Sequence, residues 1–207
     1  MSITNPFAFA LALTSVAASV HAADFSDPTW PCVQRKVEQL SLGLMWPHPV
    51  DTTRVEDNDA LGLEVAELAD ALALRRVELD DLRPQVAAFA DRHNGDPIVL
   101  GLVFDRVFTG LSKRRTRIIS GIGEFSLGQI GLAEQIDRVR GEMDAALAAE
   151  PPDYDKVDQL EEQLDWDQLI YSDRQRSITY LCETPQIIER RLFAIAQMLQ
   201  EVVQDQG

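Results

Sequence analysis

The chain has 207 residues, with 34 Asp and Glu against 19 Lys and Arg, and its formal net charge is −15. Nucleic acid and anionic lipid surfaces repel so acidic a protein, and binding to either is not expected. The 3 His and 2 Cys form no metal-ligand spacing, and there is no Gly-x-Ser-x-Gly, phosphate loop or dinucleotide fingerprint. The sequence therefore predicts that the protein is not an enzyme and has no catalytic residue, metal site or cofactor.

Residues 1–22 are predicted to be an export signal. They contain no Asp, Glu, Lys or Arg, and an apolar run from Pro6 to Val20 leads to Val20-His21-Ala22, which suits cleavage after Ala22. The run is too short for a stable membrane helix, and no later segment approaches the roughly 20 apolar residues of a membrane span. A periplasmic protein without stable membrane insertion is expected; the alternative is an uncleaved membrane anchor.

Cys32 and Cys182 both lie beyond the predicted cleavage site. An exported protein with two Cys most simply carries one disulfide, and we predict that these two residues form it. The alternatives are a metal site and a redox thiol. Both are less favoured, because only His48 and His93 could add ligands after cleavage and no Cys-x-x-Cys is present.

Residues 23–59 are predicted to form an N-terminal strap followed by an acidic loop. Large apolar side chains crowd the segment from Trp30 to Val50, which offers only a short helical window at Val33–Leu40. Such a segment is stable only against another surface, so we expect a strap laid along the rest of the protein and held by the disulfide. The alternative is a partner-binding segment, since an exposed apolar strap is an interaction site. His48 is expected to be a loop residue.

Residues 60–95 are predicted to form a small helical cap of two helices, at residues 60–74 and 81–93. Their apolar positions recur at helical spacing: Leu61, Val65, Leu68 and Leu72 in the first helix, and Leu82, Val86 and Phe89 in the second. Pro84 is tolerated if it falls among the first four residues of its helix, whose N–H groups have no helical partner. We expect this pair to pack against the open end of a hairpin formed by the rest of the chain.

Residues 96–203 carry a heptad pattern in two runs, and the fold class expected from it is all-α, with a long antiparallel helical hairpin of coiled-coil type. Pro151-Pro152 ends the first helix, Asp153 can cap the second, and Asp96-Pro97 is a standard helix start. Arms of about fifty residues would each span roughly 75 Å. The seam positions of the first arm are Phe104, Phe108, Leu111, Arg115, Ile118, Ile122, Phe125, Gln129, Leu132, Ile136, Val139, Met143 and Ala146. Those of the second arm are Val157, Leu160, Leu164, Asp167, Tyr171, Arg174, Ile178, Leu181, Pro185, Ile188, Leu192, Ile195, Leu199 and Val202.

A turn centred on Pro151 and Pro152 predicts which residues of the two arms meet. The expected pairs are Ile122 with Leu181, Phe125 with Ile178, Leu111 with Leu192 and Phe108 with Ile195. Cys182 then falls opposite Gly121, where we expect either a close approach of the strap or a helical irregularity. Pro185 is expected to kink the second arm, or to break it with Thr184 as the cap of a new helix.

Polar residues enter the seam in the half of the hairpin nearer the turn. The register places Gln129 near Arg174 and Asp167 near Ile136. Such residues set register and orientation at a cost in stability. We therefore expect the half around Phe104–Phe125 to be the core, and the outer half with Gln129, Asp167 and Arg174 to be a partner-binding seam.

A basic run, Lys113-Arg114-Arg115-Thr116-Arg117, interrupts the acidic sequence, and the register brings it close to Arg190 and Arg191. One hypothesis is a patch of Lys113, Arg114, Arg117, Arg190 and Arg191 that binds an anion or a partner through arginine forks. The alternative is that these side chains pair with Glu183, Glu189 and the acidic loop 51–59, or point to water.

A long hairpin with polar seam positions and no recognisable chemistry favours a non-catalytic adaptor or scaffold that binds another protein of the cell envelope. The second hypothesis is a holdase chaperone that shields apolar clients with the strap and the cap, its acidity preventing self-aggregation. A small-ligand or metal-binding protein has the least support. A homodimer is also compatible with the heptad pattern. In general class the chain is similar to small exported helical chaperones and coiled-coil adaptors, a likeness that carries no residue role across.

Overall fold

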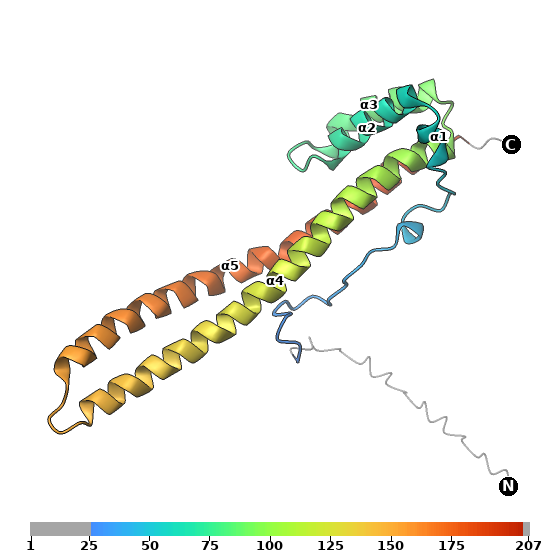
Figure 1. Ribbon diagram of the computed structural model, residues 1–207. Coiled ribbons are helices and arrows are strands. Elements are labelled where there is room, and N and C mark those ends of the chain that lie inside the picture. The colour runs from blue at the N-terminus through green and yellow to red at the C-terminus, as the bar shows by residue number, and fades with distance from the viewer. Residues whose placement is uncertain (1–25, 205–207) are drawn as a thin grey trace, which may run out of the picture.

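The computed structural model of the protein describes residues 26–204, and the predicted signal peptide, residues 1–22, lies outside them. A 3-10 turn at Leu42–Leu44 and the short helix α1 (Thr53–Glu56) come first. The paired helices α2 (Asp59–Ala73) and α3 (Leu79–Arg92) follow, and then the two long helices α4 (Pro97–Leu147) and α5 (Tyr154–Gln200). The expected fold class is confirmed: α4 and α5 form a long hairpin, with a helical cap and an N-terminal strap (Figure 1).

Local signals in the sequence determine where the two long helices begin. The Asp96 carboxylate accepts the N–H of Ile98 at 2.8 Å, with Pro97 in the first turn, and Asp153 accepts the N–H of Lys156 at 3.1 Å. Both caps satisfy N–H groups that have no partner within the helix. The helices have 51 and 47 residues, which corresponds to roughly 70–75 Å. The molecule is therefore elongated (Figure 1).

The main hydrophobic core lies at the open end of the hairpin, where α2 and α3 pack on α4 and α5 (Figure 1). The cap helices bury the apolar faces expected from their spacing, namely Val65, Leu68 and Leu72 of α2 and Leu82, Val86 and Phe89 of α3. Phe104 of α4 and Leu192, Ile195 and Leu199 of α5 are fully buried in the same core. Because each large apolar side chain contributes about 1.5–3 kcal/mol on burial, this end supplies most of the stability.

Helix α3 begins at Leu79, ahead of the predicted start at residue 81. Pro84 therefore lies inside the helix, and the expectation that it falls among the first four residues is wrong. Its missing N–H leaves the carbonyl of Asp80 without a helical partner, but Asp80 is exposed, so water can bond to that carbonyl. The burial of Leu82 and Val86 on either side of Pro84 holds together a helix that the local sequence disfavours.

The strap lies against the hairpin, as expected. From residue 26 to residue 50 the chain consists of extended stretches with short turns and bends and the 3-10 turn at Leu42–Leu44, and it runs beside the long helices from the middle of the hairpin to the cap (Figure 1). The helical window at Val33–Leu40 forms no helix. Trp30 and Trp46 are buried in different clusters along the hairpin, and the residues between them have to span that distance. An extended chain covers about 3.3 Å per residue, whereas a helix covers only about 1.5 Å.

Helix α5 runs through Pro185 without interruption, so the expected break with Thr184 as a new cap is wrong. The Thr184 hydroxyl instead donates to the carbonyl of Tyr180 at 2.9 Å, one turn earlier. Cys182, Pro185 and Ile188 are all buried on one side of α5. The packing of these buried residues compensates for the loss of the helical hydrogen bond to the carbonyl of Leu181, which Pro185 cannot make because it has no N–H.

Candidate functional site

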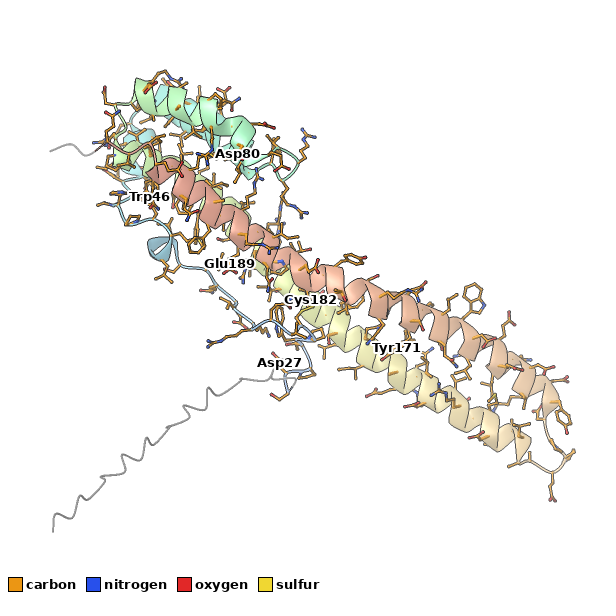
Figure 2. All side chains as sticks on the ribbon, turned by 180° about the vertical axis from the view of Figure 1, so that it is seen from behind. Asp27, Trp46, Asp80, Tyr171, Cys182 and Glu189 are labelled. Carbon is orange, nitrogen blue, oxygen red and sulfur yellow. A yellow bond between two sulfur atoms is a disulfide. The ribbon has the colours of Figure 1, made fainter. Side chains whose placement is uncertain are left out.

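The strap is joined to α5 by the predicted disulfide between Cys32 and Cys182, whose Cα atoms are 5.6 Å apart across 150 residues of sequence. Trp30, Ile119 and Ile122 pack around the disulfide as a second, smaller core. Figure 2 shows the strap passing from Asp27, beside Cys182, to Trp46 at the cap. Disulfides are typical of proteins that fold in an oxidising compartment, which suggests a location outside the cytoplasm.

Asp27 organises the beginning of the strap. One carboxylate oxygen accepts the N–H of Thr29 at 2.8 Å and its hydroxyl at 2.6 Å, and the other accepts Nζ of Lys36 at 3.0 Å. The hydroxyl of Thr29 and then the ammonium of Lys36 are the main causes that lower the pKa of Asp27 to about 2. The strap therefore carries its own polar clasp beside the disulfide.

The strap rests on a stripe of α4 formed by Ile119, Gly123 and Ser126. The Ser126 hydroxyl donates to the carbonyl of Pro28 at 2.7 Å, and a Cβ at Gly123 would lie 3.4 Å from Thr29. A Cβ at Gly121 would meet nothing within 4 Å, so the close approach expected at Gly121 occurs at Gly123 instead. Two residues turn a helix by about 200°, which places these two glycines on opposite sides of α4.

A groove of about 500 Å³ lies between the strap and α5, and we call it the strap groove. Trp30, Val37, Pro185 and Phe193 supply apolar walls. Arg35, Arg115 and Arg190 also line it, and Glu189 is the one carboxylate among its lining residues. Pockets for small ligands are usually apolar with a few polar groups and have volumes of about 300–1,000 Å³, and the strap groove resembles them.

Arg115 occupies a seam position and is only 4% exposed. Its Nη1 donates to the carbonyl of Val37 in the strap at 2.6 Å, and its Nη2 lies 3.5 Å from a carboxylate oxygen of Glu189. Its Nε–H has no hydrogen-bond partner in the described part of the chain. Burial lowers the pKa of Arg115, and Glu189 opposes that shift. A single guanidinium thus connects α4, α5 and the strap.

The structure divides the predicted basic patch. Lys113, Arg114 and Arg117 are exposed on α4 and do not line the strap groove, whereas Arg190 does. Arg191 turns to the cap and donates to the carbonyls of Leu72, Leu74 and Val77 at 2.9, 2.7 and 3.0 Å. These carbonyls lie in the last turn of α2 and in the loop that follows it. The C-terminal end of a helix carries a partial negative charge, so a cation is favourable there. The groove therefore gathers Arg190 with Arg35 and Arg115, two arginines that the predicted patch did not include.

Of the three polar seam residues, Gln129 and Asp167 contact the other arm. Gln129 does so at Tyr171 and Gln175, on either side of the predicted Arg174, and Asp167 at Gln135, next to the predicted Ile136. Gln129 is 9% exposed, and its Nε2 donates to the carbonyl of Tyr171 at 3.2 Å and to Oε1 of Gln175 at 3.5 Å. Asp167 accepts Nε2 of Gln135 at 2.8 Å. Arg174, by contrast, is exposed. Beyond these polar contacts a third, small core around Ile136, Val139, Leu160 and Leu164 closes the outer half.

Trp166, Leu169 and Ile170 form an apolar stripe on the exposed surface of α5, and each is at least 40% exposed. Their i, i+3 and i+4 spacing puts them on one face of the helix. The seam residues Leu164 and Tyr171 point to α4 from a different face. This α5 stripe was not among the predicted site residues, because the heptad pattern marks only the seam and the stripe lies outside it.

Within residues 26–204, none of the helices combines the length and the hydropathy of a membrane span. The same residues contain no group of three or more His, Cys, Asp or Glu placed to hold a metal ion. A scan against models of protein families found no match, and searches of curated proteins and of solved structures found no significant match.

Proposed function

We propose that the protein is a periplasmic adaptor or scaffold whose outer hairpin half binds a helix of another envelope protein. The observation that supports this best is the α5 stripe of Trp166, Leu169 and Ile170. Trp is the residue most often found at energetic centres of protein interfaces, and apolar anchors at i, i+3 and i+4 suit helix-to-helix docking. The export-like pattern of residues 1–22 and the Cys32–Cys182 disulfide support the periplasm as the location.

The surroundings of the stripe indicate the chemistry of the partner. Two exposed acidic side chains, Glu162 and Asp165, flank it. A complementary partner helix presents apolar side chains flanked by Lys or Arg. Such charge complementarity governs partner choice and the rate of encounter more than it governs affinity.

The decisive experiment places a photo-crosslinking amino acid at position 166 in cells that express the protein. The proposal expects one discrete adduct whose crosslinked peptide is a helical segment with basic flanks. The adduct should disappear in Ile170→Asp and persist in Tyr180→Asp, which introduces the same carboxylate in place of another exposed large side chain on α5. A ladder of many adducts, or none, contradicts the proposal, and an adduct with a second copy of this chain assigns the stripe to a homodimer.

The alternative function is a holdase chaperone, and Val33, Leu44 and Leu63 support it. These apolar side chains of the strap and the cap are each about 70% exposed or more. A light-scattering assay separates the two functions, because a holdase suppresses the aggregation of several unrelated client proteins at stoichiometric amounts. An adaptor leaves those clients unprotected.

A further inference from the structure

We propose that the strap groove binds a small amphiphilic carboxylate, a molecule with one carboxylate group and an apolar body. The carboxylate lies at Arg115 and Arg190, and the body lies against Val37 and Phe193. This inference goes beyond the adaptor function, because the groove is formed by the strap and the inner half of α5, away from the α5 stripe.

The charge of the groove favours an anion. Arg35, Arg115 and Arg190 line it against the single carboxylate of Glu189, in a protein with a net charge of −15. Glu189 repels an anion, but it lies 3.5 Å from Arg115, at the outer limit of a hydrogen bond, and neutralises only one of three cations. A local excess of positive charge between low-dielectric walls concentrates anions there.

Two residues of the groove also have polar atoms without hydrogen-bond partners. These atoms are Nε of Arg115 and Oε1 of Gln34, and both are buried. Buried polar groups are nearly always paired, and an unpaired charged donor is the most costly exception. A carboxylate can accept two parallel hydrogen bonds from one guanidinium. The Gln34 amide presents an N–H in place of Oε1 when it is rotated by 180°, and this adds a further donor for the same anion.

The apolar walls distinguish an amphiphile from a simple inorganic anion. Phe193 is 48% exposed and Val37 is 39% exposed, although both line the groove. Exposed large apolar side chains that are grouped together mark a surface that a ligand or a partner covers. An apolar body removes these two side chains from water, whereas a phosphate or sulfate ion leaves them wet. Both halves of the proposed ligand therefore have a counterpart in the groove.

The test is calorimetric titration of the disulfide-intact protein with decanoate below its micelle concentration, compared with decanol and with acetate. Decanoate should bind saturably and about tenfold more tightly than decanol, a factor that corresponds to one charge-assisted contact. Acetate, which has the head group without the body, should show no saturable binding in the same range. Equal binding of decanoate and decanol, or no saturable binding of decanoate at millimolar concentration, overturns the proposal.

Two charge-matched variants locate the carboxylate. Arg190→Gln removes a cation from the groove and should weaken decanoate binding by about tenfold or more. Arg114→Gln removes the same charge from the exposed surface of α4, outside the groove, and should leave the affinity unchanged. Phe193→Ser should weaken decanoate as well, while thermal melting shows that each variant is folded. Unchanged affinity in Arg190→Gln, or an equal loss in Arg114→Gln, places the anion elsewhere and overturns the proposal.

Discussion

The indole of Trp46 lies directly over the backbone of Gly101. A Cβ at position 101 would be 2.9 Å from its Nε1 and 3.5 Å from its Cε2. Trp46 is 2% exposed and stacks on Phe104, with 5.6 Å between the ring centroids. This buried indole of the strap therefore occupies the space that any side chain at position 101 would need.

This contact predicts opposite effects of alanine at two glycines of α4. Gly110→Ala adds a Cβ in open space and should stabilise the protein by up to about 1 kcal/mol, because alanine favours the helix. Gly101→Ala gains the same propensity but displaces a buried indole, an overpacking cost of about 1–3 kcal/mol. Urea denaturation of both variants should separate their free energies of unfolding by that cost. Equal stabilisation by the two changes would show that Trp46 moves aside freely.

Loss of the disulfide should release the beginning of the strap around Trp30 and Cys32, while Trp46, the cap and the hairpin stay folded. In the Cys32→Ser/Cys182→Ser double variant, the unfolded chain regains the freedom of a very long loop, worth at most about 5 kcal/mol. The main core at the cap contains neither Cys residue, so the far-UV spectrum of the double variant should remain helical. Thiol labelling of the wild-type protein, purified and denatured without reductant, should find no reactive Cys. Two readily labelled thiols would contradict the disulfide.

Arg191→Ala should loosen the cap. The side chain donates to three carbonyls between Leu72 and Val77, and burial lowers its pKa, so this cation has exchanged water for the end of α2. Hydrogen bonds to charged groups contribute about 1.5–3 kcal/mol, and we expect a loss of about 2–3 kcal/mol in the free energy of unfolding. Arg190→Ala, at the neighbouring exposed position, is the control and should change stability by less than about 0.5 kcal/mol. Equal losses in the two variants would refute the role given to Arg191.

The hairpin could be predicted because its signals are local and repeated. Asp96 and Asp153 cap helices with side chains that neighbour the N–H groups they bond. The heptad pattern sums a weak preference over many turns, so it is insensitive to single polar residues such as Gln129. The disulfide could be predicted because the chain has only two Cys, so only one pairing is possible. In these three respects the sequence and the structure agree.

The strap groove could not be predicted, because it depends on the path of an extended segment that has no periodicity. Arg115 reads as one cation in a basic run, yet its buried position depends on the carbonyl of Val37, 78 residues earlier in the chain. Arg191 looks like an equivalent cation in the sequence, yet it bonds to the end of α2 and the loop after it, 114 to 119 residues away. Nothing in the neighbouring sequence distinguishes Gly101, which packs under an indole, from Gly110, which faces open space. Long-range contacts of single side chains decide all three.

Gln129→Leu should stabilise the outer half of the hairpin. The buried amide makes one good hydrogen bond, to the carbonyl of Tyr171, and leaves its Oε1 without a partner. Leucine removes that unpaired atom and adds apolar area to the seam, for a gain of about 1 kcal/mol. Hydrogen exchange of the α4 and α5 amides near the turn should slow in this variant. Gln163→Leu, at an exposed position of α5, should leave exchange unchanged. Faster exchange in Gln129→Leu would mean that the bond to Tyr171 outweighs the unpaired oxygen.

The clasp at Asp27 should weaken in acid. The pKa of Asp27 in the folded protein is about 2, below the pKa of about 3.9 for an Asp in an unfolded chain. The ionised carboxylate therefore contributes its full stabilisation above about pH 4. That contribution is lost as the pH falls from about 4 to about 2. The amide of Thr29, which donates to this carboxylate at 2.8 Å, should report the titration by NMR with a midpoint near pH 2, and a midpoint near 4 would contradict the clasp. At neutral pH, Asp27→Asn should speed exchange of the Thr29 amide, whereas Glu38→Gln, which alters only the longer 3.7 Å contact to Lys36, should not.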